Sequence, residues 1–212
     1  MSDTFEIVEV QDIDVEDNSI YVVVDTFVFS TTVTTALDNS SIDAVHTYMD
    51  IEQLKGKSFP TGGEDPLDSS VMNSPLPFRN TEYESDKVGL TSDNGAKRVH
   101  QLLNKGADTV ALGCLRNAVS VGMKLREDDR DAYIVPADSH NTPVIEDYFA
   151  SMVISNISRG YEHNENEVET IREKGRDCMD PDHRSDRLEF CLEFDKTDTI
   201  PLTSDGVFTS WD

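Results

Sequence analysis

The sequence predicts an α/β fold, in which a parallel or mixed sheet is flanked by helices. The first observation is the run 20–24, five apolar residues without a polar break, which is typical of a strand buried on both faces. The second is that short apolar runs alternate with segments of helical periodicity along most of the chain. At 212 residues the chain can form one substantial core, so we expect a single domain over 1–212. The only place for a subdivision is the charged stretch 160–185.

The remaining strands are expected where runs rich in β-branched or aromatic residues are bounded by polar turns. The first run, 5–10, is expected at an edge of the sheet. The last two runs, 199–202 and 207–208, are expected to close the sheet edge. The runs expected between them are 42–48, 109–114, 132–137 and, with a polar turn at its end, 88–95.

Helices are expected between the strands, several of them after a polar residue that can accept hydrogen bonds from the first N–H groups. The candidate caps are Ser30, Thr31 or Thr32, then Asp50, then Asn117. The helices are expected near 33–37, 51–54, 96–103, 118–126 and 145–157, with a charged surface helix within 162–187. The stretch 55–87 is expected to be a long loop, because Gly, Pro, Asn and Ser interrupt it, and long loops are often functional.

The chain is strongly acidic, with 42 Asp and Glu against 18 Lys and Arg and a formal charge of −24. A dispersed negative surface keeps a protein in solution where concentrated salt screens its self-repulsion. We therefore expect a cytoplasmic protein of an extreme halophile; the alternative is an acidic protein of an ordinary organism. No basic patch is visible in the sequence, which argues against a nucleic-acid partner.

Nothing in the sequence indicates a membrane span or an export signal. The longest apolar run is far below the roughly 20 residues that a span requires. The stretch 1–6 has neither the basic nor the apolar region of a signal peptide. The three cysteines, Cys114, Cys178 and Cys191, are far apart, which favours reduced thiols and a cytoplasmic location.

Polar residues gather where the predicted strands end. Asp25 directly follows the first buried strand, and Asn94 and Gly95 begin a helix. Glu146 and Asp147 lie in the first turn of a later helix. Ligands of open α/β sheets bind outside the carboxyl ends of strands, where carboxylates suit Mg²⁺ and helix starts suit phosphate. The pattern favours metal-assisted hydrolysis of a phosphate ester; in a simpler interpretation, these acidic residues only cap and stabilise their helices.

The order of these motifs resembles that of the 2-phosphosulfolactate phosphatase family of coenzyme M biosynthesis. The matching segments, which together span most of the chain, are Asp25 with Ser30–Leu37, Gly62–Glu64, Asn73–Pro75, Thr91–Gly95, Gly113–Asn117 and Glu146–Asp147. The resemblance implies the family's own α/β fold. It also implies a Mg²⁺-dependent phosphatase whose substrate carries a carboxylate and a sulfonate beside the phosphate.

The resemblance further implies roles for individual residues. Asp25 and Glu64 are the catalytic candidates, and Glu146 and Asp147 join them as candidate Mg²⁺ ligands. Contacts to the phosphate or substrate are expected from Ser30, Thr31, Gly63, Asn73, Ser74, Asn94, Gly95 and Asn117. The expected partner is a small phosphorylated acid, with no nucleic acid and no membrane, while formation of a homo-oligomer is left open.

Several positions depart from the family's pattern. Two arginines, an acidic residue and a threonine of that pattern are replaced here by Val28, Asp65, Pro77 and Ala96, respectively; Asp93 stands in place of a further threonine and Asp138 in place of a glycine. An arginine can clamp phosphate through two charge-assisted hydrogen bonds, so its loss weakens anion recognition. Two hypotheses follow: a phosphatase with a shifted substrate, or a family member that binds a ligand or partner without catalysis. Convergence of Asp25, Glu64 and Asn94 in space would favour the enzyme.

Overall fold

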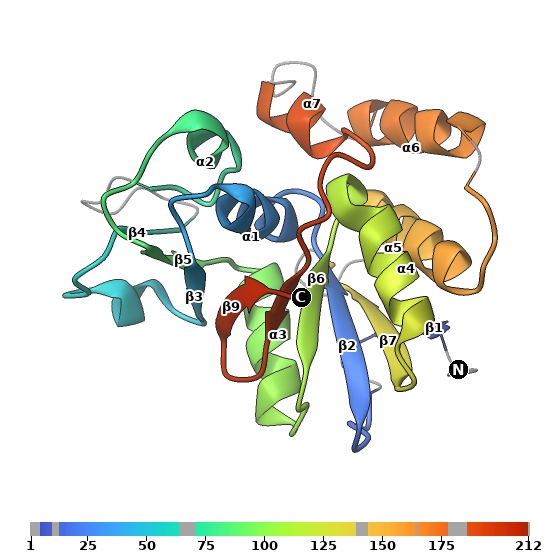
Figure 1. The fold of residues 1–212 in the computed structure, drawn as a ribbon, viewed down its shortest axis with the longest axis horizontal. Coiled ribbons are helices and arrows are strands. Elements are labelled where there is room, and N and C mark those ends of the chain that lie inside the picture. The colour runs from blue at the N-terminus through green and yellow to red at the C-terminus, as the bar shows by residue number, and fades with distance from the viewer. Residues whose placement is uncertain are drawn as a thin grey trace.

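The computed structural model describes residues 5–9, 13–63, 71–138, 144–163, 165–177 and 186–211. Within these residues, nine strands form one sheet in the order β1-β7-β2-β6-β8-β9-β3-β5-β4 (Figure 1). The strands are β1 (Phe5–Ile7), β2 (Ser19–Val24), β3 (Ala44–Tyr48), β4 (Thr61–Gly62), β5 (Lys87–Thr91), β6 (Val110–Gly113), β7 (Asp131–Pro136), β8 (Pro201–Thr203) and β9 (Val207–Ser210). Every strand that the sequence predicts is present, and the mixed sheet confirms the α/β class.

A hairpin in the middle of the sheet joins two parallel halves. Strands β7, β2 and β6 run parallel, with Val22 of β2 opposite both Ala111 and Ile134. Strands β3, β5 and β4 also run parallel with one another. Between these halves, β8 pairs antiparallel with β6, and β9 pairs antiparallel with β3. The prediction that the C-terminal strands close the sheet edge is therefore wrong; their insertion leaves neither β6 nor β3 with an unpaired edge.

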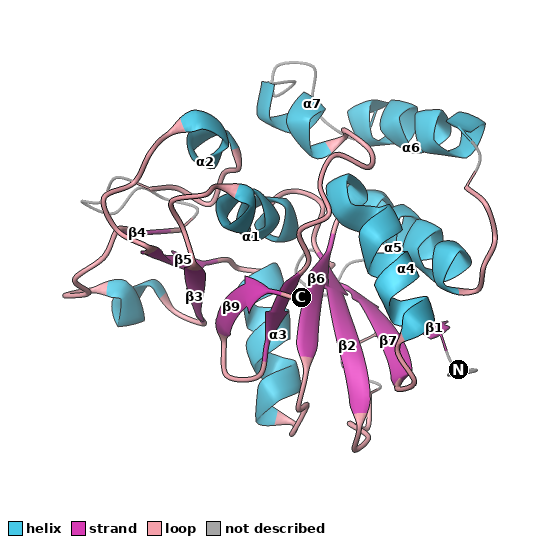
Figure 2. Cartoon of the chain, in the orientation of Figure 1, coloured by secondary structure: helices cyan, strands magenta, loops and turns pink. Residues whose placement is uncertain are grey.

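Helices cover both faces of this sheet (Figure 2). The α-helices are α1 (Phe29–Asp38), α2 (Leu76–Asn80), α3 (Gly95–Asn104), α4 (Ala118–Glu127), α5 (Ile145–Ser158), α6 (Glu165–Asp177) and α7 (Asp186–Cys191), and the short 3₁₀ helices are η2 (Ile51–Leu54) and η3 (Leu115–Asn117). None of the described helices is both long enough and apolar enough to cross a membrane. The charged helix expected within 162–187 is confirmed as α6.

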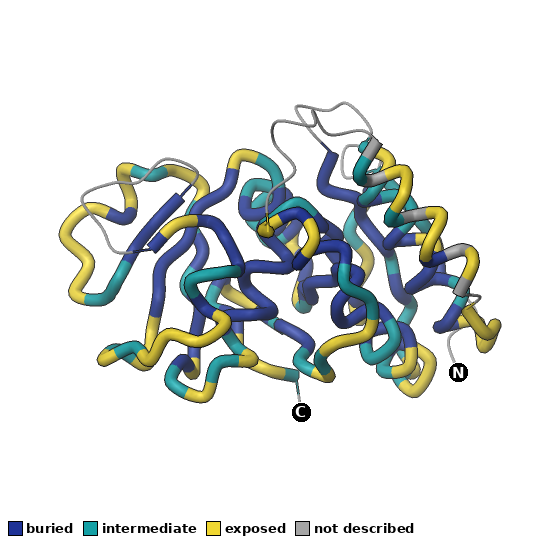
Figure 3. Tube along the Cα trace, turned by 90° about the horizontal axis from the view of Figure 1, so that it is seen from above, coloured by how far each residue is buried: buried dark blue, intermediate teal, exposed yellow. Residues whose placement is uncertain are grey.

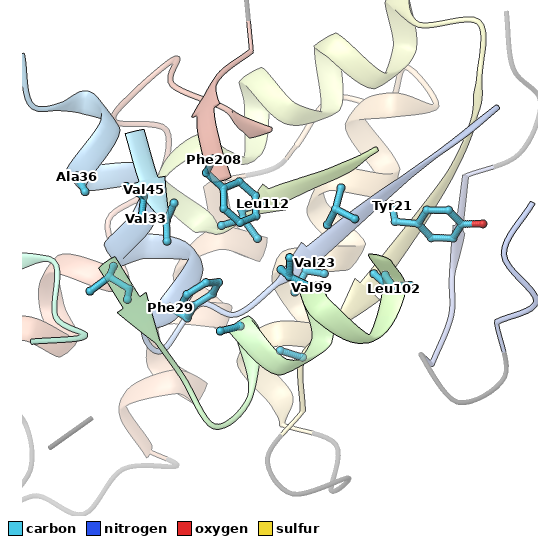
Figure 4. Close-up of a cluster of buried hydrophobic side chains, with 14 of the residues drawn as sticks. Tyr21, Val23, Phe29, Val33, Ala36, Val45, Val99, Leu102, Leu112 and Phe208 are labelled. Carbon is cyan, nitrogen blue, oxygen red and sulfur yellow. The ribbon is translucent and has the colours of Figure 1, made fainter. Parts of the chain in front are cut away.

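Strand β2 contributes to two apolar clusters, one on each face of the sheet. Tyr21 and Val23 pack with side chains of α1 and α3 (Figure 4). Ile20, Val22 and Val24 pack with side chains of α4 and α5. All six residues of β2 are buried, and the buried backbone runs through the centre of the molecule (Figure 3). The predicted burial on both faces is confirmed, and each fully buried valine contributes about 1.5–3 kcal/mol.

The start of α1 differs from the prediction. This helix begins at Phe29, so the three hydroxyl residues that follow lie inside its first turn. Asp25 Oδ1 instead accepts a hydrogen bond from the Phe29 N–H at 3.1 Å. The prediction that Ser30, Thr31 or Thr32 caps the helix is wrong. Asp25 thus contributes one hydrogen bond to the first turn of α1, while Val28 holds the N-cap position.

Of the other two predicted caps, one is confirmed and one is wrong. Asp50 Oδ1 accepts a hydrogen bond from the Glu52 N–H at 2.9 Å, which confirms it as the cap of η2. Asn117 precedes α4 but makes no capping bond to it. The Asn117 Oδ1 atom instead accepts a hydrogen bond from the Cys114 N–H at 2.9 Å.

The stretch 55–87 is only partly a loop. It holds the two-residue strand β4 and the five-residue helix α2, which the sequence did not reveal. Prolines mark this segment as irregular, yet Pro77 lies in the first turn of α2, where a missing N–H breaks no helical hydrogen bond. Residues 64–70 lie outside the described part of the chain.

The formal charge of −24 makes the stability of this fold depend on salt. We expect the melting temperature to rise by on the order of 10 °C between about 0.1 and 2 M KCl, because the Debye length shrinks to a few ångströms. Circular dichroism during heating measures the change, and a sucrose series controls for effects other than screening. A melting temperature that stays constant across the KCl series would contradict the halophile prediction.

Candidate active site

Asp25 lies at the carboxyl end of β2 and connects this strand to the starts of two helices. Its Oδ1 accepts the Phe29 N–H of α1, and its Oδ2 accepts the Gly95 N–H of α3 at 2.9 Å. The residue is only 4% exposed. Both helices direct the positive ends of their dipoles at the carboxylate, which favours its ionised form. Asp25 thus connects α1 and α3 through hydrogen bonds, and it is also a candidate metal ligand.

Asp147, in the first turn of α5, faces the same strand end. Its Oδ1 accepts a hydrogen bond from the Thr26 N–H at 2.8 Å. Burial and then the negative charge of Asp25 hold the pKa of the Asp147 carboxyl well above its ordinary value. Glu146, which is half-buried, and Asp138 add further negative charge. Two carboxylates from distant parts of the chain therefore oppose each other in a site with little water.

Asp138, at the carboxyl end of β7, is a third carboxyl group of this region, and it was not among the predicted site residues. It is 6% exposed, and within the described residues its buried Oδ1 atom has no hydrogen-bond partner. Burial raises the pKa of Asp138, while the charge of Arg98 lowers it. The signal was present in the sequence, since Asp138 follows β7 almost as Asp25 follows β2. The sequence analysis noted Asp138 only as a departure from the family's pattern, which has glycine at this position, and assigned it no role.

The residues at this strand end fit a magnesium ion. Within the described residues, no group of three or more His, Cys, Asp or Glu side chains is arranged to hold a metal. Mg²⁺ needs only one or two carboxylates, because water and substrate phosphate complete its shell. The opposed carboxylates of Asp25 and Asp147 provide such a pair, and Asp138 adds a buried oxygen that has no hydrogen-bond partner among the described residues. Glu64, the other predicted ligand, lies outside the described residues.

Gly95 brings the start of α3 into contact with Asp25. A Cβ atom at this position would lie 2.4 Å from Phe29 Cδ1 and 2.6 Å from Asp25 Oδ2. Asn94, immediately before it, is half-buried, and its N–H donates to Ser92 Oγ at 3.3 Å. The Gly95 N–H donates to Asp25 and so orients this carboxylate, which means that it does not face an open anion site in this structure.

A cavity of about 340 Å³ adjoins this helix start, at the carboxyl ends of β3 and β5. Its lining is formed by Met49, Asp50, Ile51, Thr91, Ser92, Asp93 and Lys97. Asp93 is only two residues from Gly95, so their Cα atoms are at most about 7 Å apart. The short segment 93–95 therefore links the cavity, which Asp93 lines, to the Asp25 carboxylate, which the Gly95 N–H binds.

Two further predicted segments reach the wall of this cavity. A Cβ atom on Gly63 would lie 2.8 Å from Thr91 Cγ2, so the backbone of Gly63 packs directly against β5. The carbonyl of Gly63 accepts a hydrogen bond from the Asn73 N–H at 2.8 Å. Asn73 is 3% exposed, and its buried Oδ1 has no partner within the described residues. Ser74, also buried, follows it. The segments around Gly63, Asn73 and Thr91, which are far apart in the sequence, thus lie together at the carboxyl end of β5.

The other predicted phosphate contacts are occupied by hydrogen bonds within the protein. Ser30 Oγ donates to the Val23 carbonyl at 3.2 Å and accepts the Asp25 N–H, and Thr31 Oγ1 donates to the Thr26 carbonyl at 2.9 Å. Asn117 Nδ2 donates to the Thr199 carbonyl at 3.0 Å. These bonds fix the turns that follow β2 and β6. A contact from these three residues to phosphate stays a prediction.

Comparison with known proteins decides the family. The family model described as 2-phosphosulpholactate phosphatase matches residues 6–206. The chain belongs to this phosphatase family. Two relatives carry the name "Probable 2-phosphosulfolactate phosphatase". The one from Clostridium beijerinckii is 25% identical, over 91% of this chain and 92% of the relative. The one from Caldanaerobacter subterraneus subsp. tengcongensis is 24% identical, over 93% and 92%.

Two of the departures from the 2-phosphosulfolactate phosphatase pattern, Val28 and Ala96, lie close to Asp25. Val28 immediately precedes α1 and is half-buried. Ala96 is fully buried behind Gly95. A neutral aliphatic side chain at position 28 cannot replace the hydrogen bonds of an arginine. Pro77 lies in α2, and Asp65 is outside the described residues.

The basic residues that could replace these arginines have different surroundings. Arg98 is buried and donates from Nε to the Ala137 carbonyl at 2.9 Å, next to Asp138. Lys97 is half-exposed and pairs with Asp93. Arg116 is buried, pairs with Glu193 and faces a separate small cavity behind α1. Of Arg98 and Arg116, Arg98 is therefore the arginine that lies near Asp138 at the candidate site.

Proposed function

We propose that the protein is a Mg²⁺-dependent phosphatase that hydrolyses the phosphate ester of 2-phosphosulfolactate or of a related phosphorylated 2-hydroxy acid. The observation that carries the proposal is the buried pair of carboxylates, Asp25 and Asp147, at the carboxyl end of β2, where N–H groups of the chain orient both. Such a pair is costly for a fold, because burial without a cation raises the energy of both charges. A function that requires a cation and an anionic ester explains why the cost is retained.

Asp25 and Asp147 would hold the metal in this proposal. When bound, Mg²⁺ would neutralise the charge of the phosphate and activate a water molecule. The hydrogen bonds from the Phe29 and Gly95 N–H groups fix the Asp25 carboxylate, so little of its conformational freedom is lost on binding. The Thr26 N–H orients Asp147 in the same way.

We assign the proton transfer to Asp138. Hydrolysis breaks the bond between phosphorus and the ester oxygen, and the departing alkoxide needs a proton. Burial raises the pKa of the Asp138 carboxyl, and its Oδ1 is not engaged by another described residue. A carboxyl group with a raised pKa can hold a proton nearer to neutral pH and donate it to a leaving oxygen.

One observation favours a second function, ligand binding without catalysis. Both carboxylate oxygens of Asp25 and the hydroxyl groups of Ser30 and Thr31 already take part in hydrogen bonds within the protein. When these groups are engaged within the protein, they are not available to a substrate, as expected of a family member that has lost catalysis. This alternative predicts that the protein binds phosphorylated acids and leaves them intact.

Phosphate release separates the two functions. The protein would be incubated in molar KCl with 2-phosphosulfolactate and a panel of phosphorylated 2-hydroxy acids, with Mg²⁺ or with EDTA. We expect release with Mg²⁺, a fall of about 10²-fold or more with EDTA, and recovery when excess Mg²⁺ is returned. Protein that is folded by circular dichroism but releases no phosphate from any ester would disprove the phosphatase.

A further inference from the structure

The cavity of about 100 Å³ behind α1 lies where four segments of the chain meet. The end of α1, the helix α2, the short helix η3 and the end of α7 with the residues after it all line this cavity, and α1, α2 and α7 lie at the top of the view in Figure 1. Its described lining includes none of the carboxylates of the candidate active site. Two of the chain's 18 Lys and Arg residues, Arg79 and Arg116, line it instead.

Both arginines lie against the same aromatic ring. Arg116 Cζ is 3.8 Å and Arg79 Cζ is 5.6 Å from the centroid of the Phe190 ring. The face of the ring attracts each cation. The two guanidinium groups nevertheless repel each other, because both are positive and lie close to one ring. An anion that contacts both groups would offset this repulsion.

The hydrogen bonding of Arg116 is not completed by the protein. The residue is only 8% exposed and lines the cavity. Its NH1 group pairs with Glu193. Its Nε atom is buried and has no acceptor among the residues that the structure describes. Because a buried N–H without an acceptor is costly, this guanidinium favours a further acceptor at the cavity.

The two carboxylates of the lining are already engaged. Glu193 pairs with Arg116. Asp38 Oδ1 accepts hydrogen bonds from two threonine hydroxyls of the segment 197–199, at 2.7 and 3.0 Å, and this segment is not part of the lining. Arg79, in contrast, forms no ion pair with any other described residue, and its recorded contact is with the ring. The Arg79 guanidinium is therefore available to an anion.

We propose that this cavity binds a small oxyanion of the phosphate class, held by the guanidinium groups of Arg79 and Arg116. The planar fork of N–H donors on a guanidinium matches the oxygens of such an anion. Helix α2 directly follows Asn73 and Ser74, so the bound oxyanion would also tie the chain next to these residues to η3. The inference does not rest on the proposed phosphatase function.

Titration calorimetry with inorganic phosphate tests the proposal. The whole protein would be titrated in about 2 M KCl, where long-range attraction is screened and chloride is a constant competitor. EDTA keeps metal ions away from the Asp25 and Asp147 pair, whose negative charge then repels phosphate. We expect one saturable site within about 0.1–20 mM phosphate, the range that suits so small a ligand.

Two matched variants localise the binding. Arg79→Gln removes one of the two guanidinium groups, and Arg79 is exposed, so the fold should be retained. We expect it to weaken phosphate binding by about tenfold or more, because a charge-assisted hydrogen bond is lost. Arg126→Gln is the control, since Arg126 is also exposed in the last turn of a helix but does not line the cavity. It should bind phosphate as the wild type does.

The remaining outcomes would overturn the proposal. No saturable binding to the wild type would mean that chloride or the protein's own groups satisfy the two arginines. Unchanged binding in Arg79→Gln, with the variant folded by circular dichroism, would place the phosphate elsewhere. An equal loss in Arg79→Gln and Arg126→Gln would show that overall charge, not this cavity, sets the affinity. None of these results bears on phosphate release from an ester, which tests the phosphatase separately.

Discussion

Replacing Asp147 with Asn is expected to lower phosphate release by about 10²-fold or more. In the absence of Mg²⁺ the same substitution is expected to raise the melting temperature at neutral pH. Asn retains an oxygen that can accept the Thr26 N–H. It removes a fully buried charge that opposes Asp25. A loss of activity together with a gain of stability would mark Asp147 as a residue kept for function.

The gain should depend on pH in a defined direction. The raised pKa means that the folded protein keeps this proton at pH values where the unfolded chain has released it. Below about pH 3 both states are largely protonated, and the raised pKa of Asp147 has little effect on stability. As pH rises through about 4, the ordinary pKa of Asp, and beyond it, the wild type loses stability and the Asn variant does not. The difference between the two proteins should therefore be small near pH 3 and reach about 1–3 kcal/mol at neutral pH, or about 2–4 °C in melting temperature per kcal/mol.

Asp25→Asn is the matched control for this experiment. It is the same substitution in the same cluster, but Asp25 accepts N–H groups with both oxygens. The amide nitrogen of Asn would face either the Phe29 or the Gly95 donor, which costs about 1–3 kcal/mol. We expect Asp25→Asn to lower the melting temperature while Asp147→Asn raises it. A fall in both variants would show that Asp147 is a structural residue only.

The parts of the fold that the sequence predicted depend on local pattern. The run 20–24 has too few polar residues for a surface position, and β2 is buried on both faces. The position of β8 and β9 in the sheet depends instead on which strands lack a partner after folding. That information lies in pairings between residues about 90–160 apart, such as Val110 with Thr203 and Val45 with Phe208, and no local pattern contains it.

The candidate site was predictable to a similar extent. Asp25 was found because it ends a buried strand, and Gly95 because it begins a helix. Their hydrogen bond joins positions 70 residues apart, which spacing alone does not show. Ser30 and Thr31 were expected to be caps because their residue types suit that role, but α1 begins at Phe29 with Val28 at the N-cap position, so both residues lie inside the helix. Asp138 was noted only as a departure from the family's glycine, because a single acidic residue in a loop has no pattern that indicates a role in the site.

Replacing Gly95 with Ala is expected to destabilise the fold and abolish activity together. Alanine favours a helix by about 1 kcal/mol over glycine, so helix propensity predicts a gain. The new Cβ would lie 2.4 Å from Phe29 Cδ1 and 2.6 Å from Asp25 Oδ2, well inside contact distance. Phe29 is fully buried, and Asp25 is held by hydrogen bonds from two helices, so neither can move freely. The overlap should outweigh propensity and give a net loss of about 2–3 kcal/mol or more.

Urea denaturation of Gly95→Ala and Gly106→Ala would separate crowding from backbone strain. Gly106 has φ +101°, and a Cβ atom added there would meet nothing within 4 Å, so alanine costs only about 1 kcal/mol of backbone strain. Phe29→Leu combined with Gly95→Ala should recover part of the lost stability, because the leucine side chain removes the aromatic edge that the new methyl group meets. If Gly95→Ala proves as stable as the wild type, the close contact between the start of α3 and Asp25 cannot be right. The orientation of the Asp25 carboxylate, on which the proposed metal site depends, would then lose its support.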